Sequence, residues 1–237
     1  MLPVLVLFLL VLLVLVLLLF IILLFPQFWV IKVIKKYSEP IETLPGTGGE
    51  LAQHLINRFE LDEVTIKKVE NGNDHYNPET KTICLSESNY DEKSLAAVTI
   101  AAHEFGHALQ HKTDYKPLLL RTKLAKIAAI AEKIASIILI SSPFAFFLVK
   151  IPIAGFIMLL AGFTIMCLPI ILHIFTLPVE FDASFNRALP ILSEGEYLSE
   201  STMPIAKKIL TAAALTYVSA SLSSLLNFYR WFLILRR

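Results

Sequence analysis

The chain has 237 residues, a formal net charge of +1 and 56% hydrophobic residues. The near-neutral charge gives no case for nucleic-acid binding, and the apolar excess over the about 45–50% of a soluble domain predicts that part of the chain contacts lipid. The two cysteines, Cys84 and Cys167, lie far apart in unlike segments, so we expect buried thiols and no disulfide framework.

The first predicted element is a membrane anchor over residues 1–36. Leu2–Phe25 carries no charge, and as a helix it would be about 36 Å long, enough for a hydrocarbon core of about 30 Å. A secretory signal is the alternative, but the stretch lacks a basic start and a small-x-small cleavage site. Lys32, Lys35 and Lys36 follow it, so the positive-inside rule places the next region in the cytoplasm.

Residues 37–126 read as a cytoplasmic catalytic region with mixed elements. Thr47 and Glu50 form a capping-box pattern that begins an amphipathic helix ending near Phe59. The segments "VTIKKVE" and "KTICLSE" predict two short strands, separated by the turn-rich loop "NGNDHYNPET". A long helix is expected from about Ser94.

The long helix contains "AAHEFGHALQH", which has the H-E-x-x-H spacing. His103 and His107 are one helical turn apart, so both imidazoles can bind one Zn²⁺. Glu104 is rotated by about 100° from His103, so its carboxylate can stand beside the metal and accept a proton from water. Surface histidines on a helix are the alternative, but the neighbouring Ala and Phe residues favour a half-buried helix. His111 lies a further turn along, about 12 Å from His103, and is expected to lie outside the metal site.

Residues 127–178 predict a transmembrane hairpin. The run from Ile134 to Val179 is apolar apart from Lys150, Pro152 and His173, and it is too long for one span. Basic residues flank it on both sides, so both flanks are expected on the side that holds Lys36.

A return segment over residues 179–208 then supplies the third metal ligand, since two histidines do not complete a catalytic zinc site. Glu180 follows an apolar run, where a carboxylate is costly unless it binds a metal or another cation. The alternative is a charge at a helix start after Pro178. Other carboxylates on the same side of the predicted membrane are Asp114, Asp182, Glu194, Glu196 and Glu200.

Residues 209–237 form a predicted C-terminal hydrophobic helix. Ile209–Tyr229 is uncharged and long enough to span a membrane, but Arg230, Arg236 and Arg237 would then lie outside. The segment therefore either spans or packs on the catalytic region, which its Ser, Thr and Ala content also suits.

The chain resembles the YugP-like neutral zinc metallopeptidase family of bacterial membranes, which is similar to gluzincin peptidases of the HtpX kind. The resemblance covers about residues 36–220 and rests on "DHYNPETKTICLSE", "AAVTIAAHEFGHALQH", "LPVEFDAS" and "KKILTAAALTYVSA". It implies that His103, His107 and Glu180 hold one Zn²⁺ and that Glu104 is the general base. HtpX-like enzymes usually have an acidic residue four positions after the third ligand, and it supports the metal ligands. This chain has Ser184 at that position, so under the resemblance we expect Asp182 to support the ligands instead.

The expected fold is a mainly α membrane protein: a helical bundle with transmembrane helices and a small α+β zincin-like catalytic region with a short sheet. The expected function is zinc-dependent peptide hydrolysis in a multi-pass cell-membrane protein, with peptide or protein substrates, including unfolded or membrane proteins, and a lipid bilayer as partners. A zinc-binding scaffold or quality-control adaptor without proteolysis is the alternative. His75, Tyr76 and Arg187 are candidates for stabilising the developing oxyanion. The strand Thr82–Ser86 is a hypothetical docking edge for the substrate.

Overall fold

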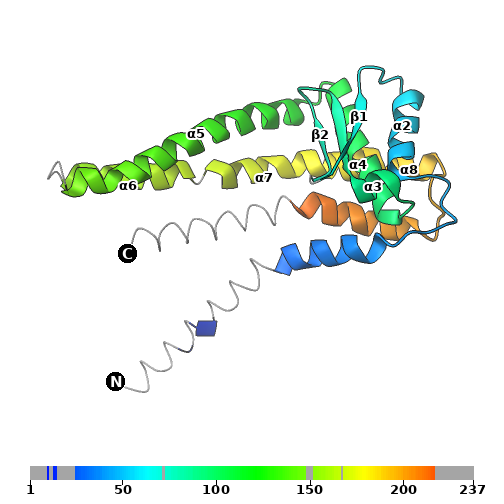
Figure 1. Cartoon of the computed structure of the whole chain (residues 1–237), viewed down its shortest axis with the longest axis horizontal. Helices are drawn as coiled ribbons and strands as arrows, with labels where there is room; N and C mark the ends of the chain where they lie inside the picture. Colours follow the sequence, from blue (N-terminus) through cyan, green and yellow to red (C-terminus); the bar gives the residue numbers. More distant parts are fainter. Residues whose placement is uncertain are drawn as a thin grey trace.

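The computed structural model describes residues 10, 13–14, 25–70, 73–147, 152–166 and 168–216. Most of the uncharged stretch Leu2–Phe25 of the predicted anchor and most of the predicted C-terminal helix lie outside these described residues. The described part consists mainly of helices, with one small sheet near one end of the molecule (Figure 1).

The sheet has three strands in the order β1-β3-β2. The two predicted strands are confirmed as β1 (Thr65–Val69) and β3 (Thr82–Ser86), which pair in parallel. The short strand β2 (His75–Asn77) lies in the segment that we expected to be a loop, and it pairs antiparallel with β3. Over Thr82–Cys84, strand β3 is thus hydrogen-bonded on both sides. The hypothesis that a substrate strand adds along the whole of Thr82–Ser86 is therefore wrong, because β2 already pairs with that edge over three of its five residues.

Three helices pack around this sheet. Helix α2 (Gly48–Arg58) begins at Thr47 with the predicted capping box, in which the Thr47 Oγ1 and Glu50 Oε2 atoms each accept a backbone hydrogen bond. Helix α3 (Glu87–Asp91) follows β3 directly. Helix α4 (Leu95–Lys112) is buried on nearly all sides, more than the half-buried helix that we expected, and it lies between α2 and the helices that follow.

The second half of the described chain is a series of helices that leaves the sheet region and returns to it (Figure 1). Helix α5 (Lys116–Phe147) runs out, and α6 (Pro152–Met166) and α7 (Leu168–Phe181) run back. The chain then forms the π-helix η1 (Asp182–Ala188), which packs against α4, and the short helix α8 (Leu189–Glu194). The expected out-and-back path is present.

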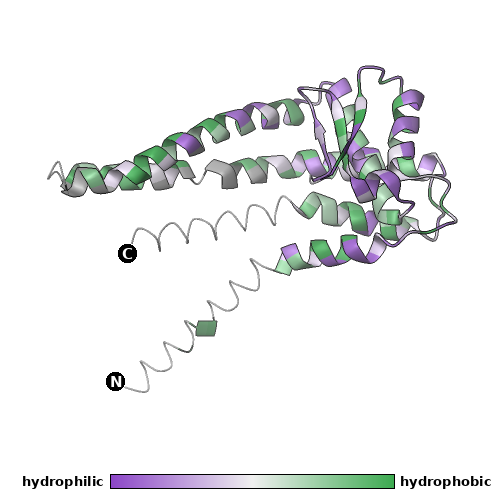
Figure 2. Cartoon of the chain, in the orientation of Figure 1, coloured by the Kyte–Doolittle hydropathy of each residue, from purple (hydrophilic) through white to green (hydrophobic). Residues whose placement is uncertain are grey.

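The prediction of a transmembrane bundle, however, is wrong. Across the described ranges no helix has both the length and the apolar character that crossing a bilayer requires. Within the described residues, α6 and α7 cover 15 and 14 residues, or about 22 and 21 Å, against a hydrocarbon core of about 30 Å. Helix α5 is longer, but its first half carries charged residues, and the hydropathy colouring shows purple segments there (Figure 2). What remains is a mainly helical protein with a small sheet.

Two further helical segments add to the buried core around α4. Residues 25–37 and 203–216 are helical, and they contribute Val30, Val33, Ile209 and Leu210 to the buried core. Both segments lie on the side of α4 that carries the predicted metal ligands, because both line a cavity that also contains His103.

Candidate metal centre

The buried polar side chains of helix α4 include those of His103, Glu104 and His107. The helix begins after Ser94, whose Oγ accepts a hydrogen bond of 3.0 Å from the backbone N–H of Ala97. Because His103 and His107 are one turn apart, their rings lie side by side, with centroids 4.8 Å apart and planes at 79°. Buried imidazoles need partners inside the protein, and the neighbouring elements supply them.

Glu180, in the last turn of α7, completes a cluster with the two histidines. Its Oε2 atom lies 3.2 Å from Nε2 of His103 and 3.3 Å from Nε2 of His107. Each of the three residues offers one ligand atom, and these three atoms all lie within 4.8 Å of one another. Glu180 is fully buried at a helix end, so the alternative of a charge at a helix start does not apply.

Ser184 sets the orientation of His103. The Ser184 Oγ lies 3.0 Å from Nδ1 of His103 and donates a hydrogen bond of 3.4 Å to the carbonyl oxygen of Leu210. With its hydroxyl proton directed at Leu210, the Ser184 Oγ can accept a hydrogen bond from Nδ1–H of His103. In the neutral ring, Nε2 then keeps its lone pair and faces Glu180.

Gln110 does the same for His107. Its Oε1 accepts a hydrogen bond of 2.9 Å from Nδ1 of His107. Its Nε2 donates bonds of 2.8 Å to the carbonyl oxygen of Val179 and to Oδ2 of Asp182. These two donations fix which end of the amide faces His107, so Nε2 of His107 is also left facing Glu180.

Asp182 anchors this network from η1. It accepts a hydrogen bond of 2.8 Å from Nε of Arg187, whose guanidinium lies 5.6 Å from the ring centre of Tyr115. Burial alone would raise the pKa of Asp182, but hydrogen bonds from Arg187 and Gln110 hold this pKa below its ordinary value. Asp182 therefore supports His107, and Ser184 supports His103. Arg187 is not among the described residues that line the cavity around Glu104.

The facing atoms of the cluster favour a bound cation. Two imidazole lone pairs and a carboxylate oxygen repel one another at these distances unless a proton or a metal ion lies between them. Burial would raise the pKa of Glu180, yet contact with His107 and His103 holds that pKa well below its ordinary value. A set of two histidines and one glutamate matches catalytic zinc sites, which have three protein ligands and one open position.

Glu104 stands beside the cluster and lines the same cavity. This cavity has a volume of about 690 Å³, and its polar wall includes Glu104, Glu180, Asp74 and both histidines. Burial raises the pKa of Glu104 to about 7; His103 opposes the rise, and the charges of Glu180 and Asp74 add to it. A carboxylate with such a pKa can both take up and release a proton near neutral pH.

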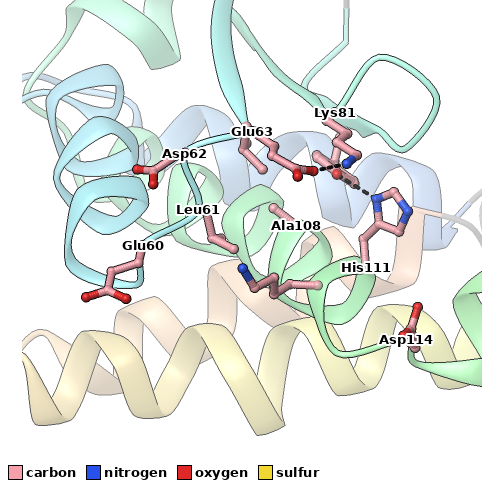
Figure 3. A pocket seen from close by; sticks show the side chains of 11 residues that line it. Glu60, Leu61, Asp62, Glu63, Lys81, Ala108, His111 and Asp114 are labelled. Atoms are coloured by element: carbon pink, nitrogen blue, oxygen red, sulfur yellow. Dashed lines mark hydrogen bonds and ion pairs between the residues drawn. The ribbon is translucent and has the colours of Figure 1, made fainter.

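The remaining predicted residues lie away from this cavity wall. His75 is exposed on β2, and its Nδ1 lies 2.8 Å from the carbonyl oxygen of Asn73. The Tyr76 hydroxyl lies 2.8 Å from Nδ1 of His111, and burial raises the pKa of Tyr76 to about 12. His111 lines a separate pocket of about 510 Å³, in which Lys81 pairs with Glu63 (Figure 3). The structure thus places His111 outside the metal site, as expected.

Sequence reasoning missed Gln110 and, on another helix, Arg121 of α5. Its Nη1 atom donates a hydrogen bond of 3.0 Å to Oε1 of Glu180. In the sequence Arg121 appears only as one of several basic residues before an apolar run, and no local pattern links it to Glu180. Its role is visible only because α5 and α7 pack together.

Known proteins match this chain over most of its length. The chain is 34% identical over 216 residues to a Bacillus subtilis (strain 168) protein named "Putative membrane protease YugP", covering 88% of this chain and 89% of that protein. No solved structure matches it. A family model described as "Putative neutral zinc metallopeptidase" matches residues 12–236. With nearly its whole length matched, the chain belongs to this zinc metallopeptidase family.

Proposed function

We propose that this protein is a zinc-dependent peptidase that cleaves peptide bonds inside proteins, with His103, His107 and Glu180 as the zinc ligands and Glu104 as the general base. The observation that carries the proposal is the convergence of three buried donors on one point beside a fourth, cavity-facing carboxylate. Family membership supports the same chemistry.

In this proposal some residues hold and orient the zinc ligands, and one residue transfers the proton. A zinc ion in this set supplies a Lewis acid that polarises the scissile carbonyl and activates water. Ser184 and Gln110 keep the two Nε2 atoms deprotonated and directed at the ligand position. The Glu104 carboxylate accepts the proton of the attacking water and passes it to the nitrogen of the leaving amine. The cavity of about 690 Å³ around Glu104 gives the substrate access to these groups.

The test is to load the purified full chain with Zn²⁺ and follow cleavage of an unfolded protein, with Glu104→Gln as the matched variant. We expect one zinc ion per chain in both forms, and loss of cleavage by at least about 100-fold in the variant, as for other general bases. Equal cleavage by both forms would exclude Glu104 as the base. Zinc binding without cleavage by either form would instead support the scaffold function.

We also propose that the protein works at a membrane and acts on unfolded or membrane proteins there. The support is the name of the Bacillus relative, the uncharged stretch Leu2–Phe25, and the exposed apolar side chains of α5 and α6, such as Ile137 and Ile157. Cell fractionation tests this proposal. Recovery of the full chain in the membrane pellet is expected, and recovery in the soluble fraction contradicts it.

A further inference from the structure

The two carboxylate oxygens of Glu180 have different partners. Oε2 faces Nε2 of His103 and of His107, whereas Oε1 accepts the hydrogen bond of 3.0 Å from Nη1 of Arg121. Glu180 is fully buried, so this carboxylate is confined between the imidazole pair on one side and the guanidinium on the other.

Arg121 reaches Glu180 from the wall of a second hollow. This hollow has a volume of about 350 Å³ and lies between α5 and the turn after β2, and His107 also lines it. The Arg121 side chain is 23% exposed, so its ion pair with Glu180 is largely shielded from water. A shielded, charge-assisted hydrogen bond constrains its acceptor far more than a surface ion pair does.

We propose that Arg121 is a positioning residue that keeps Glu180 bound to the metal through one oxygen only. This inference rests on the proposed function, because it concerns how the zinc ligands are held. A carboxylate can bind a metal ion through one oxygen or through both. For Oε1 to turn toward the metal, it must give up its bond to Arg121. Arg121 thereby preserves the open position that a catalytic zinc site needs.

A purely structural ion pair that joins α5 to α7 is the competing explanation. Such a pair would affect the stability of the fold, but it would leave the number of atoms that bind the metal unchanged. The decisive readout is therefore the coordination of the metal, which Co²⁺ reports in place of Zn²⁺. Four-coordinate Co²⁺ absorbs visible light much more strongly than five-coordinate Co²⁺.

The experiment uses the full chain loaded with Co²⁺, in the wild type and in Arg121→Met. Lys126→Met is the matched control, because Lys126 lies on the same helix and lines the same hollow but pairs with Glu79. We expect Arg121→Met to bind one Co²⁺ with weaker visible absorption and an affinity lowered by about 10- to 100-fold. Lys126→Met should match the wild type in both measurements.

A wild-type spectrum and affinity in Arg121→Met would overturn the inference. If circular dichroism shows that this variant does not fold, Arg121→Gln replaces it, with the same expectation, because a neutral, shorter side chain cannot hold Oε1 in this way. Wild-type protein that binds no metal would overturn both this inference and the proposed function. Wild-type protein that binds metal and cleaves peptides, with an unchanged spectrum in the variant, would overturn this inference alone.

Discussion

The carbonyl oxygen of Ala183 lies directly against Gly106. A Cβ atom on Gly106 would be 2.7 Å from that oxygen, closer than such atoms approach in folded proteins. Gly106 is in the middle of α4, between the two histidines, and Ala183 is in η1, one residue before Ser184. The glycine, which is costly inside a helix, is thus explained by the close approach of a second backbone.

Gly106→Ala is therefore expected to push η1 away from α4. Overpacking of this kind costs about 1–3 kcal/mol of the free energy of unfolding, and here the neighbour is backbone, which cannot turn aside. Denaturant unfolding and zinc content check the prediction, and both should fall. Gly46→Ala is the control, because a Cβ there meets only the flexible side chain of Glu50. Equal stability of the two variants would contradict the prediction.

Ser184→Ala should weaken metal binding and leave the fold intact. The change removes the acceptor of the His103 Nδ1 proton, so the ring loses its fixed orientation. We expect the dissociation constant for Zn²⁺ to rise by about 10- to 100-fold, measured by competition with a chelator. Ser142→Ala removes another buried hydroxyl, which bonds to the carbonyl of Leu139 in α5, and should leave zinc affinity unchanged. The prediction fails if the two variants bind zinc equally well.

Gln110→Leu should reduce both stability and metal affinity, because Gln110 joins α4 to α7 and η1. The apolar side chain leaves His107 Nδ1 and the carbonyl of Val179 without their bonds, at a cost of about 1–3 kcal/mol per buried group. Urea unfolding of the metal-free protein measures the first effect, and chelator competition measures the second. Gln53→Leu changes an exposed glutamine of α2 and should alter stability by less than about 0.5 kcal/mol.

The stability of the metal-free protein should depend on the protonation of Glu104. Burial raises its pKa in the folded state from 4.5 to about 7. Between these pH values the folded protein holds a proton that the unfolded chain releases, so the free energy of unfolding falls as pH rises. The contribution of Glu104 to this fall is about 3 kcal/mol over the whole window.

Glu104→Gln cannot titrate and should lack this contribution. Denaturant unfolding of both metal-free forms between pH 4.5 and 7.5 checks the prediction, and the difference between the two curves isolates Glu104. With zinc bound, the positive charge favours the carboxylate, so the difference between the forms should shrink. Parallel curves without metal would contradict the prediction.

Local features of the site could be predicted from the sequence because they depend on one helix. The spacing of His103 and His107 fixes their common face, and Ser94 marks where the helix begins. Glu180 required a different argument, based on a carboxylate at the end of an apolar run. Arg121 and the proton acceptor role of Ser184 could not be predicted, since both depend on how α5 and η1 pack against their neighbours.

The membrane architecture was mispredicted because apolar composition does not specify helix length. The run Ile134–Val179 is long enough for two spans, yet none of the described helices α5, α6 and α7 has both the length and the apolar character that a span requires. Strand β2 was missed for a related reason. A strand of three residues is shorter than the window in which alternation can be recognised.

The proposed ligands of the metal site lie far apart in the sequence. His103 and His107 precede Glu180 by more than 70 residues, and the hydroxyl of Ser184 donates a hydrogen bond to the carbonyl oxygen of Leu210, in the last described helix. A ribosome-bound chain that ends before Glu180 holds only two of the three donors. The proposed zinc site can therefore form only after Glu180 has been synthesised and lies beside the two histidines.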